Sequence, residues 1–385
     1  MKASLFVLTI FLVFSCGSPD NEIIMIDLEN LNGEEITLSE IADEITYIPL
    51  DNSITIGMIN SFYNPIVIGN SVYLYDHETG IMVFNRIGEL QGIIGTMGRG
   101  LGEYIRGNKF AVDENTGRVY VCDAGNIIKI YSGSGSFQRS ISLQSYGGSV
   151  DAIGVIDSKL FVTYNMQYGD AEFEWVLVDS TGNLLRNKRR TDDFFSSNYL
   201  AGGGTYIVGS KLNYWSNFID TVFSISDDLT INPEFIIKPG DYRLPRSRVE
   251  DPLSQLSDYV TIDQVFETRS YITIRYSFYR GKNGFVLVDR HNHDAYLSYW
   301  ERNGSGGIEN DLDGGTKFLP KGYFEENGRE YLVGLVDPVT LKTRIAGSKF
   351  RNIIPKYPEK KEELERLADK LKDIDNPILV LVRLN

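Results

Sequence analysis

The three histidines are the residues best suited to metal binding or acid–base chemistry in this chain of 385 residues. His77 lies in one predicted turn, whereas His291 and His293 share another turn, followed by Asp294. Because the repeat described below places alternate turns on opposite faces, we expect His77 to lie far from the other two. His291, His293 and Asp294 have ligand groups that suit a metal ion, but a polar turn explains the same residues better.

Three other patterns match only part of a known binding motif. Asp311-Leu-Asp313-Gly314 matches the start of a calcium loop, but the later ligands and the closing Glu are missing. Gly98-Arg-Gly100 and Gly202-Gly-Gly204 have the glycines of phosphate loops, but neither follows a strand and opens a helix. The Gly-x-Ser-x-Gly nucleophile motif does not occur. We therefore predict no catalytic residue and no cofactor, with calcium as the alternative.

Aromatic residues inside long polar turns give a stronger signal, and it points to binding. The turns cover residues 165–172, 213–218 and 277–283, and the glycine-rich loop 98–104 is expected on the same face. Aromatic rings beside Asn, Arg and acidic groups suit a sugar or a peptide, because stacking supplies contact area and polar groups supply orientation. The alternative is that these rings fold back and cap the sheets. The predicted binding residues are Arg99, Glu103, Tyr104, Tyr168, Tyr214, Trp215, Phe278, Tyr279 and Arg280.

The elements that position these turns are short strands that repeat along the chain. Equivalent residues of the third strand in each unit recur at steps of 47, 47 and 45, at Val83, Ile130, Leu177 and Val222. The next step, to Leu287, is 65 residues and predicts an insertion at 238–258. Four strands per 40–50 residues are typical of propeller blades, which cover each other's faces around an axis. We therefore predict an all-β fold, a six-bladed β-propeller over residues 41–385.

Both ends of the propeller are predicted to form one blade. Residues 45–50 indicate an edge strand, because Pro49 lacks the N–H that a central strand needs. Residues 378–384 form a second strand without a partner of its own. Placed together in the last blade, the N- and C-terminal strands close the ring.

One segment, 358–373, has the pattern of an amphipathic helix. Its apolar residues are spaced i, i+3, i+4 and i+7, at Leu364, Leu367, Ala368 and Leu371. We predict that this face packs on the last blade, and the alternative is a helix that binds a partner.

The first residues resemble a bacterial lipoprotein signal. A positive start and about twelve apolar residues precede Ser15-Cys16-Gly17, which predicts a signal peptide at 1–15 and lipidation of Cys16. Val13 stands where Leu is commoner, and an ordinary secretory signal is the alternative. Residues 16–40 are then a tether and lead-in. Cys122 is expected to be a buried, unreactive thiol.

Composition excludes several classes of partner. The 52 acidic and 38 basic residues give a formal charge of −14, so nucleic acid is not expected as a partner. Anionic lipid headgroups are excluded for the same reason, which leaves the lipid anchor as the contact with a membrane. We expect a monomer.

The repeat and the two ends of the chain also resemble a known group of proteins. The unit 110–143 resembles an NHL-type blade, with a strand ending in Asp before a strand ending in Tyr. The mature chain resembles six-bladed β-propeller lipoproteins of Gram-negative gut anaerobes, through residues 44–50, 98–104 and 375–384. Leu101 stands where that family usually has Pro. The resemblance implies a cell-envelope location, at the outer membrane facing the periplasm or the cell surface, with nutrient capture as one role.

These observations predict a lipid-anchored, extracytoplasmic binding or scaffold module that recognises a glycan, a peptide or an envelope protein through one propeller face. The alternative is a propeller enzyme, a lyase or a calcium-dependent hydrolase, with its site at the channel mouth. Acids recur at strand ends and suit either a site or the capping of turns: Asp76, Asp123, Asp179 and Asp289. A structural spacer is a third possibility.

Overall fold

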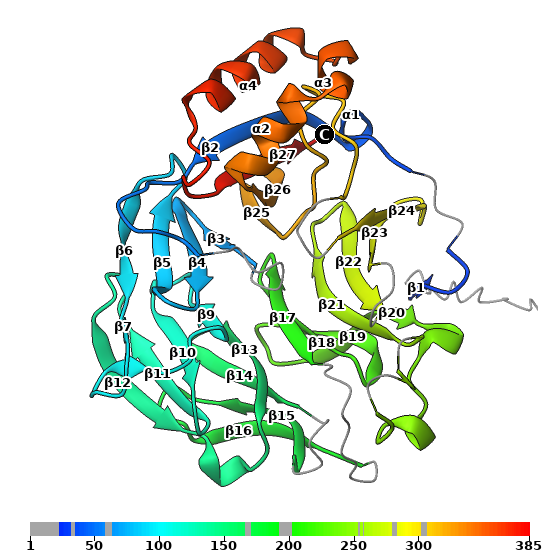
Figure 1. Cartoon of the computed structure of the whole chain (residues 1–385). Coiled ribbons are helices and arrows are strands. Elements are labelled where there is room, and N and C mark those ends of the chain that lie inside the picture. The colour runs from blue at the N-terminus through cyan, green and yellow to red at the C-terminus, as the bar shows by residue number, and fades with distance from the viewer. Residues whose placement is uncertain are drawn as a thin grey trace, which may run out of the picture.

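A computed structural model of the chain describes residues 23–31, 35–57, 64–165, 171–191, 202–252, 255–256, 258–278, 283–301 and 306–385. Within these residues, six sheets of at least four strands stand around a central axis (Figure 1). The first strand of each repeat unit lies at the axis, where the six together line a cavity. The structure confirms the six-bladed β-propeller and its all-β class.

The first three blades each use four consecutive strands that pair in sequence order. Blade 1 consists of β3 (Ile66–Ile68), β4 (Ser71–Asp76), β5 (Gly80–Asn85) and β6 (Leu90–Ile94). Blade 2 consists of β9 (Phe110–Val112), β10 (Val119–Asp123), β11 (Ile127–Tyr131) and β12 (Phe137–Ser142). Blade 3 consists of β13 (Val150–Ile156), β14 (Lys159–Tyr164), β15 (Phe173–Val178) and β16 (Leu184–Arg189). The short strands β7 (Thr96–Met97) and β8 (Glu103–Tyr104) pair within the connection from blade 1 to blade 2, and η1 (Gln144–Tyr146) lies between blades 2 and 3.

The last three blades carry the additions to the basic repeat. Blade 4 consists of β17 (Gly203–Val208), β18 (Lys211–Ser216), β19 (Ile219–Ile225) and β20 (Ile231–Lys238), with β1 (Ile24–Asp27) as a fifth, parallel strand outside β20. Blade 5 consists of β21 (Val260–Glu267), β22 (Tyr271–Phe278), β23 (Asn283–Asp289) and β24 (Ala295–Trp300). Blade 6 consists of β25 (Gly322–Glu326), β26 (Arg329–Val336), β27 (Ile378–Leu384) and β2 (Ala42–Pro49). The predicted insertion lies between blades 4 and 5 and contains η3 (Gly240–Tyr242) and η4 (Arg246–Arg248).

Blade 6 closes the ring with strands from both ends of the chain, as predicted. The outer strand β2 runs antiparallel to β27, with Ile45 opposite Val382. The Arg383 guanidinium binds both carboxylate oxygens of Asp43, at 2.7 and 2.9 Å. Pro49 ends β2 on the free edge of the sheet, where its missing N–H costs no ladder hydrogen bond.

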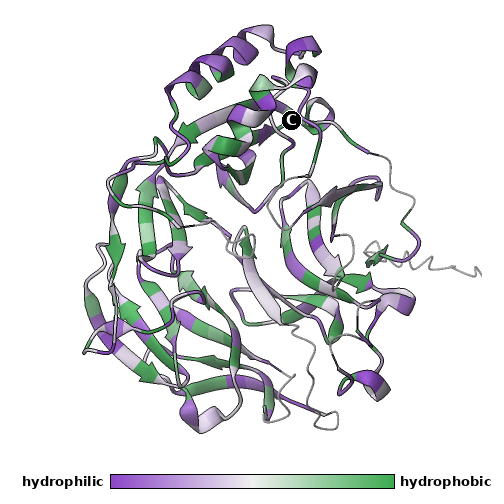
Figure 2. Ribbon diagram, in the orientation of Figure 1, coloured by the Kyte–Doolittle hydropathy of each residue, from purple (hydrophilic) through white to green (hydrophobic). Residues whose placement is uncertain are grey.

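The middle strands are apolar on both faces because neighbouring blades cover both faces. All five residues of β10 are buried. Tyr120 packs in an apolar cluster with blade 3, whereas the next residue, Val121, packs in a cluster with blade 1. The outermost strand of the same blade, β12, alternates between exposed and less exposed residues, since solvent replaces a neighbour at the rim. In Figure 2 the hydrophobic residues accordingly lie along the strands of the blades.

Three helices interrupt blade 6 between β26 and β27: α2 (Pro338–Ala346), α3 (Ser348–Asn352) and α4 (Pro358–Lys370). The predicted helix is α4, which begins at Pro358 and ends before Leu371, whose backbone is extended. Leu364 packs in one apolar cluster with residues of α2, α3 and blade 6, as the amphipathic pattern predicted. The short α1 (Leu38–Ile41) precedes β2. Among the described residues, no helix is long and apolar enough to cross a membrane.

The ring has two distinct faces. The connections between blades and the turns between second and third strands share one face, here called the link face, which also carries α2, α3 and α4. The turns between first and second strands and between third and fourth strands form the opposite face, here called the far face. Each innermost strand therefore starts at the link face and ends at the far face.

Candidate functional site

A cavity of about 790 Å³ lies on the axis of the propeller. The innermost strands of all six blades line it, together with the residues that precede several of them on the link face. Pockets of roughly 300–1,000 Å³ are typical of small-molecule sites, which combine apolar walls with a few polar groups. The size of the cavity suits a small ligand or a short segment of a larger one.

The link end of the cavity contains charged side chains of both signs. Lys109 and Lys321, from the segments that open blades 2 and 6, line the cavity with Asp151 and Asp263. The Lys109 ammonium donates a 2.6 Å hydrogen bond to the Val150 carbonyl oxygen. Burial raises the pKa of the Asp151 carboxyl. The link end of the cavity therefore combines charged side chains with the apolar residues of the innermost strands.

Lys321 is buried although it carries a charge at its ordinary pKa. Its side chain is 3% exposed, and it lines both the axial cavity and a cavity of about 320 Å³ between α2 and blade 6. Burial, and after it the nearby positive charge of Arg275, lower the pKa of Lys321 to about 7, against the opposing attraction of Asp337. The Lys321 main chain is held by β26 and by Gln264, whose Nε2 donates to the Lys321 carbonyl oxygen at 2.7 Å.

Arg275 lies behind this end of the cavity, in the second strand of blade 5. It is 1% exposed, and its guanidinium stacks over the Trp300 ring, 5.2 Å from the ring centroid. One nitrogen, Nη2, lies 3.4 Å from Asn64 Oδ1, whereas Nε and Nη1 have no hydrogen-bond partner among the described residues. Burial lowers the pKa of Arg275 to about 10.

The far end of the cavity has more acidic than basic side chains. Glu114, Glu325 and Glu330 line it there with a single cation, Arg269. Arg269 Nη2 lies 3.1 Å from Glu325 Oε1, and the Glu330 carboxylate accepts from the Arg269 backbone. Aromatic rings stand between the two ends, where Phe266 and Tyr323 stack with centroids 5.9 Å apart. The charged residues that line the cavity are thus balanced in sign toward the link face and mostly negative toward the far face.

The sequence-predicted Tyr104 has a structural role. It is fully buried between blades 1 and 2, and its hydroxyl donates to the Ile94 carbonyl and accepts from the Ile81 N–H, at 2.9 and 3.0 Å. Burial raises the pKa of Tyr104 to about 12. Glu103 accepts from the Gly100 N–H at 2.7 Å and so closes the glycine-rich loop. Only Arg99 projects from this loop as an exposed side chain among the three predicted residues.

The placement of Tyr214 and Trp215 in a turn is wrong. Both belong to β18 and are buried, and the turn that follows consists of Asn217 and Phe218 alone. Neighbouring strand residues point to opposite faces, so Tyr214 packs toward blade 3, stacked on Phe223, and Trp215 packs toward blade 5. Because both faces of an inner blade strand are covered, aromatic residues fill the space between blades, and a polar neighbourhood in sequence does not expose them.

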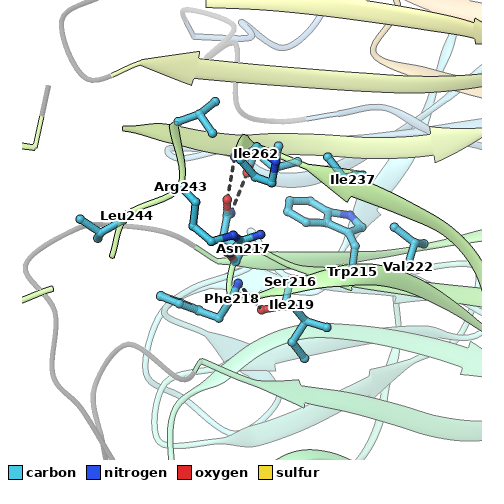
Figure 3. Close-up of a pocket in the computed structure, with 12 residues that line it drawn as sticks. Trp215, Ser216, Asn217, Phe218, Ile219, Val222, Ile237, Arg243, Leu244 and Ile262 are labelled. Carbon is cyan, nitrogen blue, oxygen red and sulfur yellow. Dashed lines mark hydrogen bonds between the residues drawn. The ribbon is translucent and has the colours of Figure 1, made fainter. Parts of the chain in front are cut away.

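Trp215 lines a small cavity of about 40 Å³ between blades 4 and 5 (Figure 3). Asn217 closes it by pairing with Ile262 of blade 5: its Nδ2 donates to the Ile262 carbonyl at 2.8 Å, and its Oδ1 accepts from the Ile262 N–H at 2.7 Å. The volume is room for about two or three water molecules. This cavity therefore belongs to the contact between two blades, and Trp215 also lines the axial cavity.

Of the remaining predicted binding residues, the structure describes Phe278 alone. Phe278 is half-buried at the end of β22, edge-on to Tyr242 of the insertion, with ring centroids 5.1 Å apart. Four of the predicted positions lie outside the described residues: Cys16, Tyr168, Tyr279 and Arg280. Of the predicted binding residues that are described, Trp215 alone lines the axial cavity.

Acids at strand ends hold turns and connections. Asp76 Oδ1 accepts from the N–H groups of the turn after β4, and Asp289 Oδ1 does so after β23. Asp123 accepts from two N–H groups of the connection between blades 1 and 2. Asp179 likewise accepts from the turn after β15. These carboxylates therefore act as caps, which is one of the two roles that the sequence allowed.

The other candidate ligand residues are dispersed or bonded to the protein. His77 lies in the β4–β5 turn on the link face, whereas His291 and His293 lie in the β23–β24 turn on the far face. Asp313 is buried and accepts from Asn310 Nδ2 and the Gly315 N–H, at 2.7 and 2.8 Å. In the described part of the chain, His, Cys, Asp and Glu side chains form no group of three or more that is arranged to hold a metal ion.

Apart from Trp215, the residues that line the cavity were not predicted from the sequence, because the turns were considered and not the starts of the innermost strands. Polar residues stand at or just before that position in several blades, as the chain shows at Asn64, Lys109, Asp151 and Lys321. An alignment of the repeat units on their first strands reveals this recurrence. The proximity of Lys321 to Arg275 cannot be found in this way, because the two residues belong to different blades.

Comparison with the solved structure of a putative exported protein supports the fold. A putative exported protein from Bacteroides fragilis has a similar structure, with 21% identity, 94% of this chain and 99% of that chain covered, and a TM-score of 0.70. A protein of unknown function from Bacteroides thetaiotaomicron gives 12% identity, coverage of 88% and 75%, and a TM-score of 0.45. BamB from Moraxella catarrhalis gives 10% identity, coverage of 89% and 99%, and a TM-score of 0.40.

Sequence families give a direct assignment. No curated protein matches the chain in sequence. The model of a domain of unknown function, DUF4934, matches residues 22–383, which include every blade. The chain therefore belongs to the DUF4934 family.

Proposed function

We propose that this protein is an extracytoplasmic binding module that holds its ligand, a glycan or a peptide, at the link end of the axial cavity. The observation that carries the proposal is the cavity of about 790 Å³, whose wall combines aromatic rings with charged groups. Stacking surfaces and a few fixed polar groups are what such ligands require. A loop of an envelope protein is a further ligand that the link face suits.

Filling the cavity is expected to abolish binding. Asn108 lies just before β9, at the link end of the cavity, which it lines with an exposed side chain. Asn108→Trp adds a large ring at that end and should lower retention on glycan and peptide arrays at least tenfold, because the ligand loses volume that it occupies. The control is Val339→Trp, at a half-exposed position on α2 outside the cavity wall. Retention that is equal for both variants would contradict the axial site.

The proposed location rests on the first sixteen residues and on the structural similarity to a protein named as exported. A short positive start, an apolar stretch and Ser15-Cys16-Gly17 support acylation of Cys16, with the propeller held at the outer membrane, facing the periplasm or the cell surface. The acidic net charge supports contact with the membrane through the anchor alone, and we propose a monomer that binds no nucleic acid.

Removing the acylation site should release the protein from the membrane. We expect wild-type protein in the membrane fraction of its host and Cys16→Ala in the soluble fraction, since the acyl chains supply the membrane affinity. The second cysteine provides a matched control, because Cys122 is buried and burial raises the pKa of its thiol to about 11. Cys122→Ala should therefore remain in the membrane fraction. Wild-type protein that fractionates as soluble would refute the anchor.

A further inference from the structure

Two buried cations at the link end of the cavity have no acidic partner at ion-pair distance among the described residues. Lys321 and Arg275 are both more than nine-tenths buried, and neither forms an ion pair within 4 Å in the described part of the chain. Their charges act on each other, since Arg275 disfavours the protonated form of Lys321. Like charges placed together in a low-dielectric site are costly, and such an arrangement is characteristic of a site that receives an anion.

The neighbouring polar groups do not relieve this imbalance. The Asp263 carboxylate accepts a 3.0 Å hydrogen bond from Ser277 Oγ and attracts Arg275 from beyond ion-pair distance. Asp337 attracts Lys321 in the same way, from its exposed position before α2. Gln264 is a third buried residue without all of its partners, because its Oε1 has no hydrogen-bond partner in the described residues.

The balance of charge changes along the cavity. At the link end Lys109 and Lys321 line the cavity with two acids, Asp151 and Asp263. Outside this lining, Arg275 adds a buried positive charge, and the negative charge of Asp337 lies at an exposed position. At the far end three glutamates face one arginine. A ligand with one negative group therefore has a preferred direction in the cavity, with that group toward the link face.

We infer that the Lys321 ammonium receives an oxyanion group of the ligand, a carboxylate, sulfate or phosphate, at the link end of the axial cavity. Lys321 makes the contact because it lines the cavity, whereas Arg275 lies behind the wall and is a positioning residue that adds positive charge. The inference rests on the proposed function and narrows it to acidic ligands. An acidic sugar and the carboxyl terminus of a peptide both supply the required group.

Sulfate tests the anion site directly. We compare thermal unfolding of the full protein in sodium sulfate and in sodium chloride at equal ionic strength, for wild type, Lys321→Met and Lys317→Met. Lys317 is the matched control, since it is 41% exposed on the side chain and lies 3.4 Å from Glu309. Sulfate stabilises proteins in general, so the difference between variants is the informative quantity. We expect wild type and Lys317→Met to share an additional sulfate-dependent rise in melting temperature that Lys321→Met lacks. An equal rise in all three overturns the inference.

Two matched ligand pairs then identify the source of the oxyanion. Isothermal titration compares digalacturonate with its methyl ester, and trialanine with its amide. We expect the acid of one pair to bind at least tenfold more tightly than its neutral form, and Lys321→Met to abolish that preference. Arg275→Gln should reduce the preference while leaving binding of the neutral form unchanged.

The outcomes separate this inference from the proposed function. If the acid and neutral forms bind with equal affinity and Asn108→Trp loses binding of both, the result would support a ligand at the link end of the cavity and refute the oxyanion site. Specific sulfate protection without binding of any sugar or peptide would support the oxyanion site and contradict a glycan or peptide as the ligand.

Discussion

Ile45→Asp is expected to lower the free energy of unfolding by about 4 kcal/mol or more, because it places an unpaired charge inside the blade that closes the ring. Ile45 lies in β2 and is buried in the apolar cluster that joins blade 6 to blade 5 and to the helices. The free energy of unfolding of a protein is about 5–15 kcal/mol, so this loss should leave a large unfolded fraction near physiological temperature. Denaturant titration followed by tyrosine and tryptophan fluorescence measures it.

The next residue provides the control. Thr46 is exposed on the opposite face of the same strand, so Thr46→Asp introduces the same charge into solvent. Its effect should be within about 0.5 kcal/mol, as for surface substitutions in general. A similar loss for both variants would indicate that β2 tolerates no charge on either face, and a negligible loss for Ile45→Asp would show that closure by β2 is dispensable.

Lys321→Met should stabilise the unliganded protein at pH 6 by roughly 2–4 kcal/mol, because a buried, unpaired ammonium costs several kcal/mol and a thioether of similar length does not. The folded pKa is about 7, against an ordinary value of 10.5. The unfolded chain therefore binds more protons than the folded one between these values, and the wild-type free energy of unfolding rises with pH across that window. The advantage of the variant should shrink there by at most about 1.4 kcal/mol per pH unit.

The expected stability difference between wild type and Lys321→Met depends on the charged groups near the Lys321 ammonium. Arg275 lies behind it in β22, Asp263 lies on β21, and Asp337 and Arg344 line the cavity under α2. Chemical denaturation from pH 6 to pH 9.5, with wild type and Lys321→Met in parallel, measures the difference. Lys317→Met should differ from wild type by less than about 0.5 kcal/mol throughout, as a surface substitution. A wild type that is more stable than Lys321→Met at pH 6 would show that another group compensates the ammonium.

The fold could be predicted from sequence because its determinants are local and repeated. The spacing of Val83, Ile130, Leu177 and Val222 identifies the third strands, and all four residues lie in β5, β11, β15 and β19. Pro49 correctly indicated an edge strand, since the constraint acts within a single residue. The helices α2 and α3 were not predicted, because each is short and their apolar residues are buried by contacts with blade 6 and α4.

The candidate site depends on distant residues, and sequence patterns do not report such proximity. Asn64, Gln264, Arg275 and Lys321 come from three different blades or connections and meet only when the ring is closed. The placement of Tyr214 and Trp215 in a turn was wrong for the converse reason. Their neighbours in sequence are polar, but their neighbours in space are the apolar faces of blades 3 and 5.

The parallel pairing of β1 with β20 bears on how an acylated form would sit on a bilayer. Eight peptide steps separate Cys16 from Ile24, a span of at most about 28 Å when fully extended. β1 is the outermost strand of blade 4, so acyl chains on Cys16 would tether the propeller to lipid from its outer edge. The point of attachment would then lie away from the axis, and the link end of the cavity would stay clear of it.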